Sequence, residues 1–239
     1  MFVHVEDLSA GHNVTALDLA ASGVDPKQVK DVPSISDYFQ PLMDFLVSLP
    51  SHERVILVGH SLGGLAISHA MERFPEKIFV AVFVSALMPG PTLNISTLNQ
   101  ESFRRQESIL DSRYTYDDGP NNPPTTFILG PLFSATNVFQ LSPIEDLALA
   151  MLLLRPLRLY SDEDMSKVMM MSSKRYGSVD RVFVICDEDK LVKKGFQRWM
   201  VEKNPPNEVV EITGSDHMAM MSKPVELSVH LRCIANNYS

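Results

Sequence analysis

Apolar residues along the chain fall into short unbroken runs that alternate with amphipathic stretches. The runs at residues 13–19, 54–58 and 78–84 are rich in valine, isoleucine and leucine and predict strands. Between them, residues 36–49 carry apolar side chains at helical spacing, and residues 65–74 predict a second helix. Continuously apolar strands are typical of a parallel sheet covered on both faces. The rhythm therefore predicts an α/β fold, with a mostly parallel sheet and helices on both of its faces.

This rhythm stops near residue 88 and resumes near residue 174. The segment between these residues contains polar turns, followed by two apolar segments with helical character at residues 144–154 and 165–171. Residues 161–164, just before the second segment, resemble a capping box. Beyond it, strands and helices alternate again, at residues 181–186, 195–203, 208–213 and 222–236. We therefore expect a core of residues 1–88 and 174–239 and an inserted helical cap of residues 89–173.

Composition and charge exclude several classes of protein but do not indicate a particular function. The chain has 239 residues, 45% hydrophobic and 21% charged, which suits one globular core. Its formal charge of −8 argues against nucleic-acid binding, because such proteins concentrate lysine and arginine. The longest apolar run, residues 147–154, is too short to span a bilayer, and we see no secretory signal. Cys186 and Cys233 have apolar neighbours and no metal-ligand spacing, so we expect two buried thiols in a cytoplasmic protein. The acidic sequence gives no sign of an obligate assembly, and we expect a monomer or a homodimer.

Residues 59–63, Gly-His-Ser-Leu-Gly, match the pattern Gly-x-Ser-x-Gly. They lie between a predicted buried strand and a predicted helix, where a sharp turn holds the serine hydroxyl above the sheet. We expect glycine at positions 59 and 63 because a side chain there would collide with the tight backbone crossing. Ser61 is therefore the candidate nucleophile.

A serine hydroxyl becomes an effective nucleophile when a histidine takes its proton and an acid orients the imidazole. After a serine motif of this kind, the acid comes next in the chain and the histidine last. His217 lies in a polar loop after a predicted strand, whereas His230 lies among apolar neighbours in the predicted terminal helix, which favours His217 as the base. Asp187, Glu188 and Asp189 all follow the preceding strand, and their spacing does not separate them.

Several segments resemble the plant methylesterase family of α/β-hydrolases, which includes salicylic-acid-binding methylesterases, polyneuridine aldehyde esterase and hydroxynitrile lyases. They cover nearly the whole chain from Gly11 onward, at residues 14–23, 55–64, 142–150, 176–179, 188–190, 196–199 and 216–220. The resemblance implies an α/β-hydrolase fold and a carboxylesterase that hydrolyses methyl esters of small plant signalling acids, such as salicylate, jasmonate or indole acetate. It implies no cofactor and no metal. Carried over by position, Ser61 is the nucleophile, Asp189 the acid and His217 the base.

Two features distinguish this chain within that family. The hydroxynitrile lyases carry a lysine directly after the catalytic histidine, and Met218 at that position resembles the esterase branch instead. The family also begins with a strand ending in a His-Gly loop that completes the oxyanion hole. No such motif precedes Gly11, so the chain resembles an N-terminally shortened member with Leu62 N–H as its oxyanion donor. Losing one donor costs about 10²–10³ in rate, and the alternative function is therefore an impaired paralogue that binds the free acid.

The substrate is expected to be a small-molecule ester, with no nucleic acid or membrane partner. An apolar pocket supplied partly by the cap would suit an aromatic or cyclic acyl group. Asp216, beside the candidate base, is interpreted as a turn residue that shapes the loop. The candidate substrate-binding residues are His60, Leu129, Phe133, Leu152 and Met218.

Overall fold

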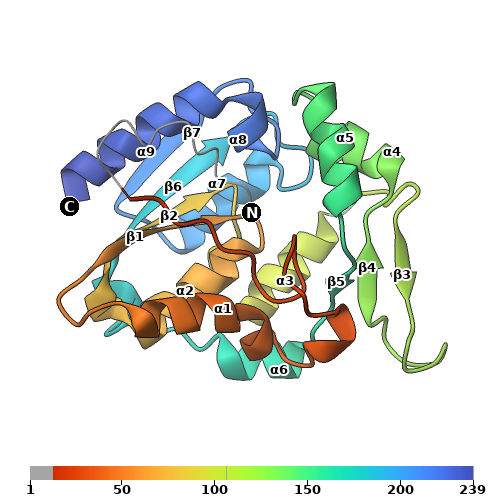
Figure 1. The fold of residues 1–239 in the computed structure, drawn as a ribbon, viewed down its shortest axis with the longest axis horizontal. Helices are drawn as coiled ribbons and strands as arrows, with labels where there is room; N and C mark the ends of the chain where they lie inside the picture. The colour runs from red at the N-terminus through yellow and green to blue at the C-terminus, as the bar shows by residue number, and fades with distance from the viewer. Residues whose placement is uncertain (1–12, 106, 239) are drawn as a thin grey trace.

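A computed structural model of the chain describes residues 13–105 and 107–238. Its centre is a four-stranded sheet in which every pairing is parallel (Figure 1). The strands lie in the spatial order β1-β2-β6-β7, so that β2 and β6 are neighbours although far apart in the sequence. Their bounds are β1 (Val55–His60), β2 (Ile78–Val84), β6 (Asp180–Cys186) and β7 (Glu208–Ile212).

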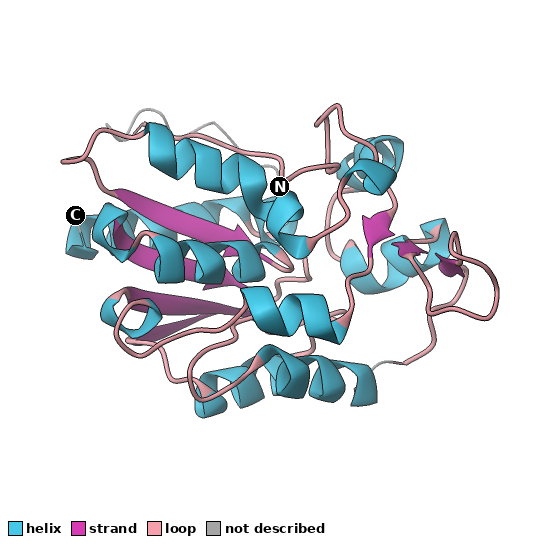
Figure 2. Cartoon of the chain, turned by 90° about the horizontal axis from the view of Figure 1, so that it is seen from below, coloured by secondary structure: helices cyan, strands magenta, loops and turns pink. Residues whose placement is uncertain are grey.

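Alternate residues of these strands face opposite sides of the sheet, and each side packs against its own helices (Figure 2). On one side, phenylalanines of β2 and β6 share a core with α1 (Ile35–Ser48), α2 (Gly63–Arg73) and α7 (Lys194–Lys203). On the other side, valines of the same two strands share a second core with α9 (Pro224–Tyr238). The predicted parallel sheet with helices on both faces is therefore confirmed.

The chain between β2 and β6 departs from the sheet and builds a separate group of elements. It includes a small antiparallel sheet in the order β3-β4-β5, which the sequence analysis did not predict. These strands are two or three residues long, too short to give a readable hydrophobic period. The elements are α3 (Ile95–Arg104), β3 (Arg113–Thr115), β4 (Thr126–Ile128), α4 (Pro131–Phe133), a π-helical turn (Ser134–Val138), α5 (Ile144–Leu153), β5 (Leu157–Arg158) and α6 (Asp162–Val168).

Of the predicted capping box before α6, the N-cap hydrogen bond forms, while the Asp164 side chain bonds to the core instead of to the N-cap backbone. Ser161 Oγ accepts a hydrogen bond from Asp164 N (3.1 Å), as expected of a helix N-cap. Asp164 Oδ2 also accepts from Ile35 N (3.0 Å) at the start of α1. The division of the chain at residues 89 and 173 stays a prediction. The other short helices among the described residues are Val29–Asp31, Pro75–Lys77, Tyr176–Ser178 and α8 (Ala219–Ser222).

The strand expected at residues 13–19 is wrong. These residues have no ladder partner within the described chain, where β1 pairs with β2. A strand exists only when a neighbour supplies backbone hydrogen bonds, whatever the β-propensity of its residues. Leu17 and Leu19 instead pack onto the core beside α1, and Ala20 N donates to Tyr38 O (3.1 Å). Among the described residues, no helix combines the length and apolar character needed to cross a bilayer.

Candidate active site

Ser61 occupies the tight turn between β1 and α2. Its backbone φ of +53° lies in the left-handed region, which is strained for a residue with a Cβ atom. The Ser61 carbonyl accepts hydrogen bonds from Gly64 N (3.1 Å) and from Leu87 N (3.0 Å), so the turn is held from both sides. A strained turn of this kind between a strand and a helix is the one that displays a serine hydroxyl above a sheet.

Two of the glycines around Ser61 occupy positions with no room for a side chain. A Cβ atom at Gly59 would lie 2.8 Å from Gly63 O and from Ile67 Cδ1, and one at Gly64 would lie 2.1 Å from Leu87 O. A Cβ atom at Gly63 would meet nothing within 4 Å. The expected collision is therefore confirmed for Gly59 and wrong for Gly63. The backbone crossing that demands a glycine is instead at Gly64.

His217 and Asp189 form a buried pair beyond the carboxyl ends of β7 and β6. His217 Nδ1 lies 2.6 Å from Asp189 Oδ2, and the two residues are 2% and 4% exposed. Asp189 Oδ1 accepts from Leu191 N (2.7 Å) and Val192 N (2.8 Å). Burial alone would raise the pKa of the Asp189 carboxyl, but His217 and the hydrogen-bond donors outweigh it and lower that pKa. Asp189 is therefore held as a carboxylate facing the imidazole.

The other two acids of this loop serve a different purpose. Asp187 Oδ1 accepts from Gly214 N (2.7 Å), and Glu188 N donates to Ser215 O (3.0 Å). Both contacts join the loop after β6 to the loop that carries His217. The alternatives that spacing left open are thus separated by geometry, because within the described chain Asp189 is the acid bonded to His217.

Ser85 also contacts Asp189, and the sequence analysis missed it. This serine directly follows β2, is fully buried, and donates from Oγ to Asp189 Oδ2. A polar residue ending a run of buried apolar residues was the available signal, since buried hydroxyls need a partner. Nothing in the sequence indicated which partner that would be.

His60, predicted to bind substrate, lies against the backbone of His217. The two rings are 4.5 Å apart between centroids, and His60 Nε2 is 2.7 Å from His217 O. A carbonyl oxygen only accepts, so Nε2 carries the hydrogen of that bond. Burial, reinforced by neighbouring His217, lowers the pKa of His60 to about 3. His60 is therefore a neutral donor that supports the candidate base.

Three of the predicted pocket residues come together in one apolar cluster, which joins the insertion to the loop after His217. Phe133 is buried with Val138 and Phe139, and Leu129 and Met218 pack against them. Met218 belongs to the loop of His217, so the cluster adjoins the candidate base. The structure does not bring Leu152 to this cluster, because its side chain is 83% exposed on α5. In Figure 1, α4 and α5 lie beyond the carboxyl ends of β6 and β7.

Asp216 is more than the turn residue that its sequence suggested. It is fully buried, and its Oδ2 accepts from Leu141 N and from Ser142 Oγ, both at 2.9 Å. Nearby, Gln140 Nε2 donates to Glu188 O (2.7 Å). Residues 140–142 of the insertion are thereby bonded to both loops that carry the buried pair. The sequence held no signal for this contact, because its partners are more than 70 residues away.

The Leu62 backbone N–H stands at the start of α2, directly after Ser61. Within the described residues it has no intramolecular acceptor, as is common for the first N–H groups of a helix. It can therefore donate to an oxyanion formed near Ser61. The expected second donor, sought before Gly11, falls on residues outside those that the structure describes.

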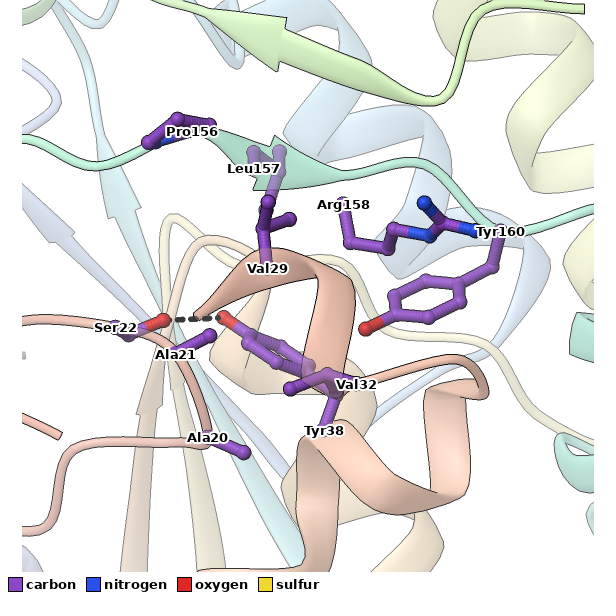
Figure 3. A pocket seen from close by; sticks show the side chains of 10 residues that line it. All are labelled: Ala20, Ala21, Ser22, Val29, Val32, Tyr38, Pro156, Leu157, Arg158 and Tyr160. Carbon is purple, nitrogen blue, oxygen red and sulfur yellow. Dashed lines mark hydrogen bonds between the residues drawn. The ribbon is translucent and has the colours of Figure 1, made fainter. Parts of the chain in front are cut away.

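A small cavity lies elsewhere, where the insertion meets residues 20–32 (Figure 3). Ser22 Oγ donates to Tyr38 Oη (3.3 Å) on the core side, and Arg158 and Tyr160 line it from the insertion. Neither Ser61 nor the pair of Asp189 and His217 lines it. Beside it, the Arg155 guanidinium donates to the carbonyl oxygens of Asp25 and Lys27. This region joins the insertion to the core and is distinct from the candidate active site.

Comparison with known proteins agrees with this geometry. The model of the alpha/beta hydrolase family matches residues 1–229. Methyl jasmonate esterase 1 of Vitis vinifera is 53% identical over 232 residues, covering 97% of this chain and 89% of that protein. Salicylic acid-binding protein 2 of Nicotiana tabacum is 44% identical over 233 residues, with the same two coverages.

A solved structure is similar over the same length. Tomato methylketone synthase I, complexed with 2-tridecanone, is 59% identical with a TM-score of 0.93, covering 97% of this chain and 90% of that one. A variant of the same enzyme was solved with beta-ketoheptanoate. The fold, the turn at Ser61 and these similarities agree over nearly the whole chain. The chain therefore belongs to the alpha/beta hydrolase family and, within it, to the plant methylesterase group of serine esterases.

Proposed function

We propose that the protein is a carboxylesterase that hydrolyses the methyl ester of a small plant signalling acid, of the salicylate, jasmonate or indole acetate type. The observation that carries the proposal is the buried hydrogen bond between His217 and Asp189. Ser61, Asp189 and His217 follow β1, β6 and β7, and the carboxyl ends of parallel strands meet at one edge of a sheet. A nucleophile, a base and an acid at that edge are the groups that acyl transfer requires.

The chemistry divides into two transfers of the acyl group. Ser61 Oγ attacks the ester carbonyl carbon and gives its proton to His217 Nε2, while Nδ1–H stays bonded to Asp189. Leu62 N–H donates to the oxyanion that forms. The bond to the methoxy oxygen then breaks, His217 protonates that oxygen, and methanol leaves. Water attacks the acyl-serine, His217 takes its proton and returns it to Ser61 Oγ, and the free acid departs.

The acyl group is expected to contact the apolar cluster of the cap. Leu129, Phe133 and Met218 offer apolar surface beside His217 and no charge. Such surface favours a ring or a short chain over a polar acyl group. Relatives named for methyl jasmonate and for salicylic acid support this class of substrate. A cytoplasmic location and a monomeric or homodimeric state stay predictions from the sequence.

The first test is hydrolysis of methyl salicylate, methyl jasmonate and methyl indole acetate by the folded protein. Ser61→Ala and His217→Ala should each lower kcat by at least about 10³-fold, because the pair act as one unit. His230→Ala, at a partly buried position of α9, is the matched control for the second variant and should keep the wild-type rate. Equal background rates in all four proteins would reject the esterase, and calorimetry with the free acids would then test the binding alternative.

The similarity to methylketone synthase I favours a second candidate, the decarboxylation of a 3-keto acid. Such an acid loses carbon dioxide by cleavage of one C–C bond, and the enolate left behind takes up a proton to give a methyl ketone. No acyl-serine forms in that reaction. Release of carbon dioxide from beta-ketoheptanoate should therefore survive in Ser61→Ala, whereas ester hydrolysis should not. Activity on the keto acid without activity on any methyl ester would replace the first proposal with the second.

A further inference from the structure

Ser85 has an unusual backbone conformation for its position. Its φ is +39°, in the left-handed region that residues with a Cβ atom seldom adopt. Its N–H donates to Val184 O (2.9 Å), so the residue is still bonded to the neighbouring strand β6. A glycine would adopt this φ without strain. Backbone geometry alone would favour glycine here, so we expect the serine hydroxyl itself to serve a purpose.

That purpose lies in the bonding of the Asp189 carboxylate. A carboxylate offers about four lone-pair positions to hydrogen-bond donors. Leu191 N and Val192 N reach Oδ1, while Ser85 Oγ and His217 Nδ1 reach Oδ2. All four positions are thus filled. The carboxylate cannot turn about its Cβ–Cγ bond without breaking at least one of these contacts.

We propose that Ser85 is a positioning residue for the reaction, which fixes Asp189 Oδ2 opposite His217 Nδ1 and shares its negative charge. The inference rests on the proposed esterase function. Ser85 Oγ bonds to Asp189, and Ser85 acts on the reaction through that carboxylate. The strained backbone aims its hydroxyl at an oxygen that already serves the base.

Loss of the hydroxyl has a definite effect on this pair. The site is fully buried, so no solvent replaces the missing donor on Oδ2. With one donor fewer, Asp189 Oδ2 carries more negative charge. The protonated form of the facing imidazole is then favoured. A protonated base cannot accept the proton of Ser61, so the acid limb of the profile of kcat/KM against pH should move to higher pH.

The experiment compares Ser85→Ala, Ser85→Gly and Ser85→Cys with the wild-type protein. Ser85→Gly removes the strain together with the hydroxyl, so it separates the two roles. We expect kcat to fall about tenfold in both Ser85→Ala and Ser85→Gly, with KM unchanged and the acid limb displaced upward. Ser85→Cys, with a weak donor of similar size, should recover part of the rate. Ser68→Ala, which removes an equally buried hydroxyl from α2, is the matched control and should leave all three quantities unchanged.

A second readout does not depend on turnover. The proton between His217 Nδ1 and Asp189 Oδ2 should give a low-field proton NMR signal in the wild type, and that signal should move in Ser85→Ala and Ser85→Gly. Wild-type kcat, pH profile and NMR signal in a folded Ser85→Gly protein would overturn the inference. If the wild type hydrolyses no ester while the signal still moves in the variants, the esterase proposal fails and the positioning contact stands.

Discussion

A single methyl group at Gly64 should disrupt the turn that carries Ser61, because no glycine around this turn has a closer backbone neighbour. Alanine at this position places Cβ 2.1 Å from Leu87 O and 2.9 Å from Ala86 Cβ. Ordinary contact begins at 3.4 Å, so the Leu87 backbone must retreat by roughly 1.3 Å. It cannot do so freely, because Leu87 N donates to Ser61 O (3.0 Å). Overpacking costs about 1–3 kcal/mol, and the obstacle here is backbone, so we expect a loss near the upper end.

Gly63→Ala is the matched control one residue away. Its Cβ meets nothing within 4 Å, and alanine is the better helix former by up to about 1 kcal/mol. Urea and thermal unfolding, followed by circular dichroism, should show Gly64→Ala melting about 6–12 °C below the wild type for a loss of 3 kcal/mol. Gly63→Ala should melt at or above the wild-type temperature. Two variants of equal stability would refute the assignment of the crowded crossing to Gly64.

Two further changes test the neighbours of His217. Folded His60 stays neutral down to about pH 3, whereas in the unfolded chain it takes up a proton near pH 6.5, so folding stability falls as the pH drops between these values. His60→Gln should remove up to about 1.4 kcal/mol per pH unit from that slope, measured by urea unfolding between pH 6 and 4, and an unchanged slope would contradict the assignment. Asp216→Ala leaves Leu141 N and Ser142 Oγ without their buried acceptor. It should cost about 1–3 kcal/mol and expose residues 140–142 to limited proteolysis, and a wild-type cleavage pattern would show that this contact does not anchor the insertion.

The sheet was predictable because its strands are continuously apolar. Residues 54–58, 78–84 and 181–186 carry this signal in the sequence itself, and each forms a strand of the parallel sheet. The turn at Ser61 was predictable for a related reason, since a glycine-flanked serine between such a strand and a helix has few alternatives. Residues 13–19 carry a similar apolar signal without becoming a strand. Apolar runs report burial, and pairing depends on a neighbour that the run does not specify.

The candidate nucleophile and base could be predicted from the sequence, but the residues that hydrogen-bond to the acid and to the cap could not. The sequence favoured His217 over His230 as the base, because one lies in a polar loop and the other in a helix. Spacing alone did not decide which of Asp187, Glu188 and Asp189 is the acid. Ser85 and Asp189 are 104 residues apart, and their contact exists only because β2 and β6 are neighbours in the sheet. The bonds from Asp216 to the cap have the same origin. Such hydrogen bonds depend on the register of distant strands and loops, which single-residue patterns do not contain.

The pairing of β2 with β6 also determines how well the fold tolerates a change in the length of the insertion. Val82 lies opposite Val182, so residues 85–179 must be looped out before the two strands can meet. The entropy of closing a loop grows only with the logarithm of its length, and each doubling adds about 0.6 kcal/mol. Doubling or halving the insertion would therefore alter the free energy of closing the sheet by only that amount. Insertions and deletions can therefore alter the segment expected to contact the acyl group during evolution, while the strands that position the reacting groups keep their register.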